Sequence, residues 1–381
     1  MKTNIIILGA TGDLAKEKIF PALAQLHKVN NELENSIDLN LITWSRSKPN
    51  IIEINSLLKF PVANSIIGSY VDEYLLESFI NQNRNAKNIF YLAVPAVVNV
   101  HFLDNFARYF TPNCTVILDK PYASDYSEIA TLKDIIFKNN LGNHVIFADH
   151  FLFKDSLSLS PSLTKFFTGI ADADRNKIAT IDISLLESEG VGHRLGFYNQ
   201  TGCINDMLPH LFVLYRLMGM YINSSIEDQM LSGFKINDIV IANSKEYLNE
   251  NESIKNTQYD IDYRKVPTAF KMLMRRDDHM ITLQSGKYLE SKISEIVVNF
   301  MDGGIMTWNI HPNMQLDYVR DTVHFTTSFN VQKKDHFYLF KDVINDDFEM
   351  FLNIDEVSAC WELLRDAQNY IDNNGLEMLV Y

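Results

Sequence analysis

Continuous apolar runs alternate with helical stretches over the first 150 residues. The runs are Ile5–Leu8, Leu39–Thr43, Ile89–Val94, Thr115–Leu118 and Val145–Ala148. They do not alternate between apolar and polar residues, which is typical of strands covered on both faces, as in a parallel sheet flanked by helices. Residues 1–150 are therefore predicted to form a doubly wound, Rossmann-like α/β domain.

The pattern changes after residue 150. Thr180–Leu186 alternates with period two, which indicates a strand with one face in water. Met207–Tyr221 is apolar almost throughout, which favours a buried helix. Ile293–Phe300 and Ile305–Ile310 are strand-like and are joined by the turn sequence Met-Asp-Gly-Gly. Residues 151–381 are therefore expected to form an α+β domain with a large, mostly antiparallel sheet.

Composition and charge narrow the functional classes. Hydrophobic residues make up 46% and charged residues 22%, which is ordinary for a globular protein with a sizeable core. The 34 Lys and Arg against 48 Asp and Glu leave a net charge of -14. Such a chain repels phosphate backbones and anionic lipid, so we expect neither a nucleic-acid nor a membrane partner. The stretch Asn223–Asn256 is polar, acidic and rich in Asn, and we expect it to be partly irregular.

The sequence also bears on location. It has no apolar run of about 18 residues that could span a membrane. The start, Met1–Asn4 followed by a short apolar run, lacks a signal-peptide cleavage region. Cys114, Cys203 and Cys360 are odd in number and have no metal or redox spacing. We expect a cytoplasmic protein with reduced thiols and no bound metal.

The segment Gly9–Ala15 follows the first predicted strand and opens the first helix. Glycines at such a turn let backbone N–H groups approach a pyrophosphate, which the helix N-terminus attracts. The pattern G-x-x-G is weak alone, but its context favours dinucleotide binding over a mere tight turn. Asp13 is also expected to cap the helix. The residues predicted to bind the cofactor here are Gly9, Thr11, Gly12, Asp13 and Leu14.

The end of the second predicted strand indicates which cofactor binds. In such folds this tip meets the adenosine ribose, and an acidic residue there would accept from the 2′-hydroxyl of NAD. Arg46, with Ser45 and Lys48, instead offers a guanidinium group to a 2′-phosphate. A solvated basic turn is the alternative. The sequence therefore favours NADP, with NAD as the second choice.

Seven segments along the chain are informative in combination rather than singly. They are Gly9–Pro21, Tyr91–Pro95, Asp119–Tyr122, Asp149–Lys154, Gly190–His210, Gly286–Leu289 and Asp355–Leu364. Together and in this order they resemble the glucose-6-phosphate dehydrogenase family. The resemblance covers nearly the whole chain, although this chain is shorter than usual members.

The resemblance implies a role for each matching residue. His210 would be the general base on the sugar C1 hydroxyl, with Asp149 as its partner. Lys120 would contact both cofactor and substrate, and its bond to Pro121 would be cis. The substrate-binding residues would be His150, Lys154, Lys287 and Lys292 at the phosphate, Glu187 and Asp206 at the sugar hydroxyls, and His311 near the substrate.

The proposed chemistry makes sense without the family. Hydride leaves C1 only as fast as the C1 hydroxyl loses its proton, so a base with a pKa near neutrality is needed. His210 lies four residues after Asp206 in a predicted helix, so the two side chains share a face. The alternative is a core histidine among apolar neighbours. Lys287 has a similar alternative as an exposed turn lysine.

Five departures from the family pattern bear on the substrate. Four are substitutions: this chain has Phe151 where the family has tyrosine, Phe153 in place of glycine, Asp119 in place of glutamate and His311 in place of glutamine. The fifth is a spacing: Asp206 and His210 are four residues apart, whereas the family has five. Removing one residue rotates a helix position by about 100°. The four-residue spacing and the Lys-Pro motif also resemble the glucose–fructose oxidoreductase and inositol dehydrogenase group, whose members oxidise other ring carbons.

Three functions are open on the sequence. The first is NADP-dependent oxidation of C1 of glucose 6-phosphate, or a close hexose phosphate, to a lactone. The second is a ring-carbon oxidoreductase acting on a different sugar, nucleotide-linked sugars included. The third, a cofactor-binding protein with a decayed site, is least favoured because Asp149, Lys120 and His210 are all present. The resemblance further implies that residues 151–381 bind the substrate and form the interface of a homodimer.

Overall fold

The computed structural model divides the chain into two compact units. Unit 1 comprises residues 1–155 and 332–358, and unit 2 comprises residues 156–331 and 359–381. The structure describes residues 2–32, 36–154, 178–221, 229–254, 262–277, 279–311, 315–328 and 335–381.

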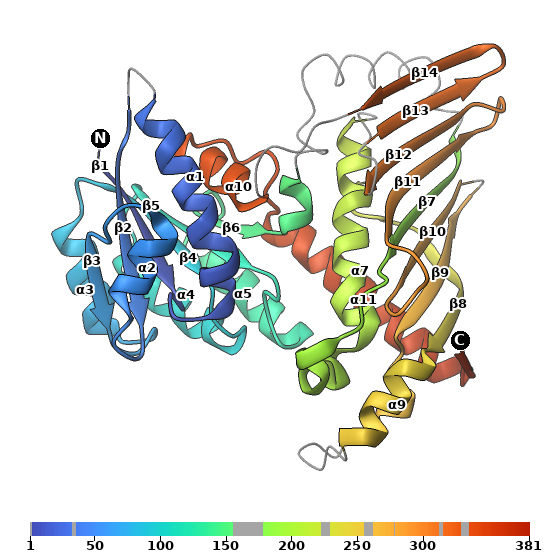
Figure 1. The fold of residues 1–381 in the computed structure, drawn as a ribbon, viewed down its shortest axis with the longest axis horizontal. Coiled ribbons are helices and arrows are strands. Elements are labelled where there is room, and N and C mark those ends of the chain that lie inside the picture. The colour runs from blue at the N-terminus through green and yellow to red at the C-terminus, as the bar shows by residue number, and fades with distance from the viewer. Residues whose placement is uncertain are drawn as a thin grey trace. The chain divides into compact units, whose positions relative to one another are not determined.

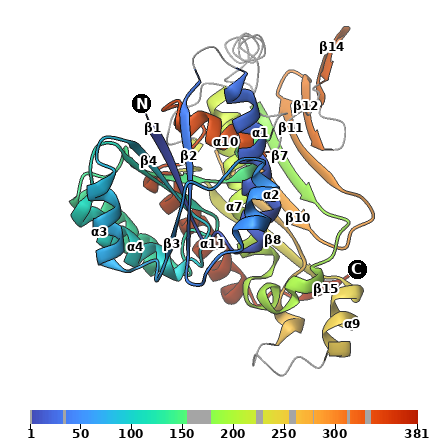
Figure 2. The ribbon, with the colours of Figure 1, turned by 60° about the vertical axis from the view of Figure 1, so that its left-hand side comes forward.

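Unit 1 is built on a six-stranded parallel sheet in the order β3-β2-β1-β4-β5-β6 (Figure 1). The strands are β1 Lys2–Leu8, β2 Asp38–Ser45, β3 Asn64–Ile67, β4 Lys87–Leu92, β5 Cys114–Asp119 and β6 Val145–Ala148. Its helices include α1 Phe20–Asn31, α2 Ile51–Leu58, α3 Glu73–Gln82, α4 Val97–Tyr109 and α5 Tyr126–Lys138. Figure 2 shows α1 and α2 on one side of the sheet and α3 and α4 on the other. The Rossmann-like fold predicted for this part is confirmed, because the predicted runs form buried strands between helices.

Residues far along the sequence complete unit 1. Helix α10, Asp335–Ile344, ends beside β4, where the Lys87 amine donates to the Asp346 carboxylate at 2.6 Å. The backbone of Phe147 in β6 pairs with that of Leu352. The sequence placed the domain boundary at residue 150 and these later residues in the second domain. The structure instead joins them to unit 1, because their buried faces and backbone groups find partners there.

Unit 2 is built on a nine-stranded, mostly antiparallel sheet in the order β14-β13-β12-β11-β7-β10-β9-β8-β15. Its strands are β7 Ile178–Leu186, β8 Lys235–Asn243, β9 Ala269–Arg276, β10 His279–Gly286, β11 Ile293–Phe300, β12 Ile305–His311, β13 Gln315–Arg320, β14 Val323–Ser328 and β15 Met378–Val380. The predicted hairpin is confirmed, since β11 pairs with β12 and Gly303 adopts φ 87° in the turn. Every second residue of β11 is buried, as its one-sided pattern requires.

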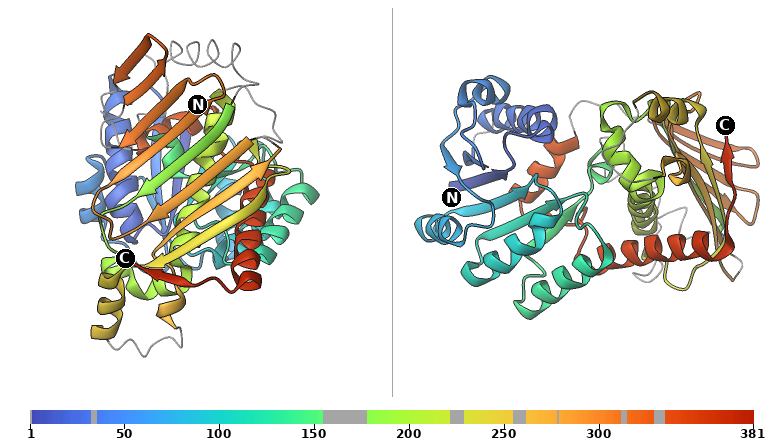
Figure 3. Two further views of the ribbon diagram at one scale, coloured as in Figure 1. Left: turned by 90° about the vertical axis from the view of Figure 1, so that its right-hand side faces the viewer. Right: turned by 90° about the horizontal axis from the view of Figure 1, so that it is seen from below.

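A long helix lies along one face of this sheet. It is α7, Leu195–Tyr221, and it is accompanied by α9 Lys245–Ile254 and α11 Ile354–Asn374, which begins in unit 1. Helix α7 is kinked at Gly202, which adopts φ 65° and ψ 173°, and the predicted buried helix is confirmed in the part that follows this kink. No described helix covers the other face, which Figure 3 shows in its left view.

The stretch 223–256 is more regular than expected. Its described residues, 229–254, include β8 and α9, so the expectation of irregular structure is wrong there. Residues 223–228, 255 and 256 lie outside the described residues. Among the described helices, none is both long and apolar enough to cross a membrane.

Candidate active site

The glycine turn of unit 1 lies at the carboxyl end of β1. Gly9 adopts φ 84°, and a Cβ added there would lie 2.0 Å from the carbonyl oxygen of Ala93. The Gly12 carbonyl accepts the first helical hydrogen bond from the Lys16 amide at 3.2 Å, so Asp13 is already helical and is not the expected cap. Thr11, Gly12 and Asp13 are exposed. An exposed helix start with no side chain at its tightest point fits the approach of a pyrophosphate.

The basic turn after β2 is next to this glycine turn. The Gly9 amide donates to the carbonyl of Trp44 at 3.0 Å, one residue before β2 ends. Ser45 is buried and its hydroxyl donates to the Ser47 carbonyl at 2.8 Å, so it is used within its own turn. Arg46 is exposed. Of the two residues predicted to meet the ribose, Arg46 is therefore the one whose side chain is accessible.

Lys120 follows β5, and its backbone amide is bound by the half-buried carboxyl group of Asp119. The Lys120–Pro121 peptide bond is cis, as predicted. Asp119 accepts from the Lys120 amide at 2.9 Å and from the Tyr91 hydroxyl at 2.8 Å. Burial raises the pKa of Asp119 to about 7, and the nearby Asp149 carboxylate acts in the same direction. Sequence reasoning missed Tyr91 as a partner; the register of β4 on β5, which brings the two strand ends together, would have identified it.

This raised pKa predicts a pH-dependent stability. Between pH 3.8 and about 7 the folded protein binds a proton at Asp119 that the unfolded chain has released, so stability falls as pH rises through this window. Asp119→Asn removes this titration. The midpoint of thermal unfolding of the variant, relative to wild type, is therefore expected to rise between about pH 4 and 7. Parallel curves of midpoint against pH would contradict the assignment.

The segment after β6 places three predicted residues in one turn. Asp149 is fully buried, and its carboxylate accepts from the Phe151 amide at 2.9 Å. His150 Nδ1 lies 4.0 Å from the Asp149 carboxylate, and its side chain is 40% exposed. Lys154 Nζ lies 3.6 Å from the centroid of the Phe151 ring. The ring that replaces the family's tyrosine therefore holds a lysine ammonium by a cation–π contact. Phe153 is buried, with its ring centroid 4.9 Å from that of Phe351.

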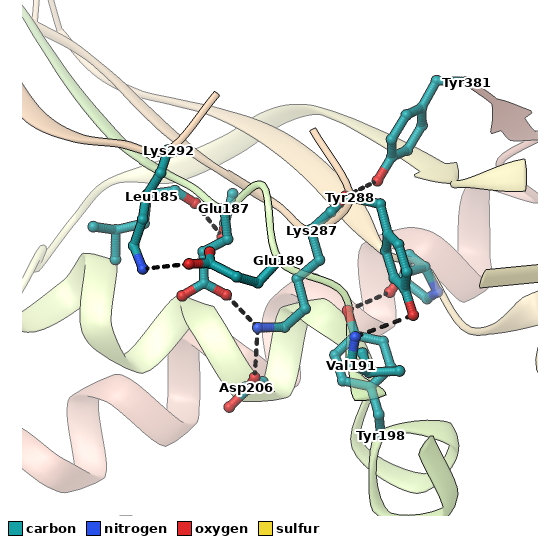
Figure 4. A network of polar contacts seen from close by, with 12 residues as sticks. Leu185, Glu187, Glu189, Val191, Tyr198, Asp206, Lys287, Tyr288, Lys292 and Tyr381 are labelled. Atoms are coloured by element: carbon teal, nitrogen blue, oxygen red, sulfur yellow. Dashed lines mark hydrogen bonds and ion pairs between the residues drawn. The ribbon is translucent and has the colours of Figure 1, made fainter. Parts of the chain in front are cut away.

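In unit 2 a buried lysine joins two predicted residues (Figure 4). Lys287 follows β10 and is 2% exposed. Its amine donates to the Glu187 carboxylate and lies 3.6 Å from the Asp206 carboxylate. Because two carboxylates offset its charge, Lys287 suits the positioning of hydroxyl acceptors better than the binding of a phosphate. The phosphate role predicted for it finds no support in this geometry.

The remaining predicted residues of unit 2 lie around this cluster. His210 is 5% exposed and follows Asp206 by one turn of α7. Lys292 forms an ion pair with Glu189 at 3.0 Å, which lowers the pKa of Glu189. His311 ends β12 and is half-buried. Since Asp149 belongs to unit 1, its expected partnership with His210 stays a prediction, and so does the contact of Lys120 with both cofactor and substrate.

Comparisons with known proteins agree with the family resemblance inferred from the sequence motifs. Two family models match, described as "Glucose-6-phosphate dehydrogenase, NAD binding domain" at residues 6–65 and "Glucose-6-phosphate dehydrogenase, C-terminal domain" at residues 167–268. Glucose-6-phosphate 1-dehydrogenase of Aspergillus niger is 24% identical over 98% of this chain and 87% of its own. The enzyme of that name from Streptococcus pneumoniae is 22% identical over 100% of this chain and 92% of its own.

Solved structures show the same fold. A glucose-6-phosphate dehydrogenase in complex with its substrate matches with a TM-score of 0.77 and 19% identity, over 100% of this chain and 94% of that one. KijD10, a 3-ketoreductase from Actinomadura kijaniata, matches with a TM-score of 0.64 and 12% identity over 100% of both chains. The two family models match in the family's own domain order. This chain therefore resembles the glucose-6-phosphate dehydrogenase family, from whose listed relatives it is strongly divergent in sequence.

Proposed function

We propose that the protein is an NADP-dependent dehydrogenase that oxidises C1 of glucose 6-phosphate, or of a close hexose phosphate, to a lactone. The observation that supports this most is the cluster of unit 2, in which Lys287 joins Glu187 to Asp206 one helical turn before His210. A base and two hydroxyl acceptors on one scaffold suit the oxidation of a sugar alcohol. The family supplies the substrate class.

The residues of unit 1 fit the cofactor. Gly9 lets the turn after β1 lie close to the Ala93 backbone, the helix that follows has an exposed start suited to a pyrophosphate, and Arg46 offers a guanidinium group to a 2′-phosphate. When bound, NADP supplies the acceptor for the hydride. Lys120, which directly follows strand β5 of the same sheet, would contact both ligands.

Each sugar-binding residue has one task in this mechanism. His210 takes the proton of the C1 hydroxyl as the C1–H bond breaks and its electron pair leaves with the hydrogen, so that a C1=O bond forms. Glu187 and Asp206 accept hydrogen bonds from other hydroxyls and fix the ring. His150 and Lys154 hold the phosphate, with Lys154 kept in place by the Phe151 ring.

Replacing Arg46 with alanine tests the choice of cofactor. A charge-assisted hydrogen bond contributes about 1.5–3 kcal/mol, so the KM for NADP is expected to rise by about 10- to 100-fold. The KM for NAD should change little, because NAD has no 2′-phosphate. Lys48→Ala, which removes another exposed cation from the same turn, is the control and should have a smaller effect. Equal effects on both cofactors would argue against 2′-phosphate recognition.

The function itself is tested by a substrate panel. NADPH formation is measured by absorbance with glucose 6-phosphate, other hexose phosphates, free sugars and nucleotide-linked sugars. We expect turnover with glucose 6-phosphate and weaker turnover with glucose. No turnover with any hexose phosphate, while NADP still binds, would reject the proposal. A preference for a nucleotide-linked sugar would favour the second hypothesis.

We further propose a cytoplasmic homodimer. The uncovered face of the unit 2 sheet supports self-association, because Met280, Ile305 and Val319 are exposed on it by 39%, 45% and 44%. Three buried, free cysteines are consistent with a reducing compartment. Light scattering of the purified protein gives the mass that decides between monomer and dimer, and cell fractionation gives the location.

A further inference from the structure

Tyr381 follows β15 and is anchored through its backbone. Strand β15 pairs in parallel with β8, the Tyr381 amide donates to the Asn243 carbonyl at 3.0 Å, and the Lys245 amide donates to the Tyr381 carbonyl at 3.0 Å. These contacts fix the position from which the Tyr381 side chain extends. Its hydroxyl is therefore presented from a defined point on the sheet.

That hydroxyl reaches the backbone of the buried lysine (Figure 4). Tyr381 Oη donates to the Lys287 carbonyl at 2.6 Å and lies 2.9 Å from the Thr268 hydroxyl. The Lys287 amide donates to the Thr268 carbonyl at 3.0 Å. Burial raises the pKa of Tyr381 to about 12, so its hydroxyl keeps the proton that it donates at neutral pH. Both peptide groups of Lys287 are thus held through Tyr381 and Thr268.

The backbone at Tyr288, directly after Lys287, has an unfavourable conformation that neighbouring contacts must stabilise. Tyr288 adopts φ 59°, in the left-handed region that a bulky residue rarely occupies. Such a conformation persists where neighbouring contacts fix it. Tyr288 Oη donates to the Glu250 carboxylate at 2.7 Å and accepts from the Val191 amide at 3.1 Å, which fixes the side chain. The carbonyl between Lys287 and Tyr288 is fixed by Tyr381.

We propose that Tyr381 is a positioning residue for the sugar site. Its hydrogen bond to the Lys287 carbonyl fixes the backbone from which the Lys287 side chain extends to Glu187 and Asp206. The link to the sugar rests on the proposed function, in which these two carboxylates accept from sugar hydroxyls. A misdirected Lys287 would leave both carboxylates without their shared cation. Tyr381 acts through Lys287 and does not itself touch the substrate.

The test removes one hydroxyl. Tyr381→Phe is expected to raise the KM for glucose 6-phosphate by about three- to tenfold, the range that one neutral hydrogen bond allows. The KM for NADP is expected to stay within about twofold, because the cofactor residues lie in unit 1. Tyr370→Phe is the matched control: its hydroxyl also donates to a backbone carbonyl, that of Asn237 at 2.9 Å, but Tyr370 has no role at Lys287.

A second measurement needs no substrate. Amine-reactive labelling followed by mass spectrometry reports the exposure of Lys287, which is 2% exposed in the wild type, with the exposed Lys235 as internal reference. Lys287 is expected to label several-fold faster in Tyr381→Phe and at the wild-type rate in Tyr370→Phe. A lower unfolding temperature with unchanged labelling would show a merely structural role and overturn the proposal.

The two readouts separate this proposal from the proposed function. If the wild type does not oxidise glucose 6-phosphate, the proposed function fails, and faster labelling of Lys287 still supports the positioning of Lys287 by Tyr381. If the wild type is active and Tyr381→Phe leaves the KM unchanged, the proposed link to sugar affinity is overturned even where labelling rises.

Discussion

Replacing His210 with asparagine is expected to lower kcat for sugar oxidation by about 10²- to 10⁴-fold, the usual contribution of a general base. Asparagine keeps a polar side chain of similar length on α7 but cannot take a proton at neutral pH. Because His210 is 5% exposed, a shorter substitution such as alanine would add a cavity, and asparagine limits that effect. The measurement is steady-state kcat with NADP binding followed in parallel.

The matched control is His101→Asn. His101 lies on α4 and is exposed, so the same chemical change there removes an imidazole outside the candidate site. Its kcat is expected to stay at the wild-type value. Unchanged turnover in His210→Asn would show that His210 is a core residue, the alternative that its apolar surroundings allow.

The second large effect is expected from Gly9→Ala. The new Cβ would lie 2.0 Å from a backbone oxygen that belongs to Ala93, and the residue would have to keep φ 84°. Rotation of a side chain can relieve neither the close contact nor the unfavourable φ, because both involve backbone atoms. We expect a loss of at least about 2 kcal/mol in the stability of unit 1 and loss of measurable NADP binding. Calorimetric unfolding and cofactor titration measure the two effects.

Gly142→Ala is the control for this change. A Cβ at Gly142 would meet nothing within 4 Å, and its φ lies outside the left-handed region. Its unfolding midpoint and NADP affinity are therefore expected to stay near wild type. If Gly9→Ala bound NADP as tightly as wild type, the glycine turn would not be the cofactor site.

Local sequence signals predicted those parts of the fold that local forces determine. The buried runs of unit 1 form strands because helices cover both faces, and the Met-Asp-Gly-Gly turn joins β11 to β12 because a glycine supplies the positive φ. Strand β3, Asn64–Ile67, was missed because it is short, lies at the sheet edge and has no buried residue.

Long-range contacts set the limit of that reasoning. No pattern within residues 332–358 indicates that they belong to unit 1, because their partners lie far away in the sequence. Asp346 binds Lys87, and Leu352 pairs with Phe147. These four residues come together only when the sheet has formed, so the boundary cannot be found from composition.

The charge pairing of Lys287 illustrates the same limit at the site. The family resemblance implied that Lys287 holds the substrate phosphate, and the local sequence left an exposed turn lysine as the alternative. The parallel register of β7 and β10 pairs Leu186 with Gly286, so Glu187 and Lys287 leave their strands side by side and form an ion pair. Tyr381, which contacts Lys287 from β15, gave no sequence signal at all, because its role arises from the pairing of β15 with β8.

The central claim is that hydrogen leaves C1 of a hexose phosphate while His210 takes the hydroxyl proton. Glucose 6-phosphate deuterated at C1, and separately at C3, is supplied with NADP, and the NADPH formed is analysed by mass spectrometry. We expect deuterium in NADPH only from the C1-labelled substrate. The rate of NADPH formation is expected to fall by about 10²- to 10⁴-fold in His210→Asn. Deuterium arriving from C3, or a full rate in that variant, would contradict the account.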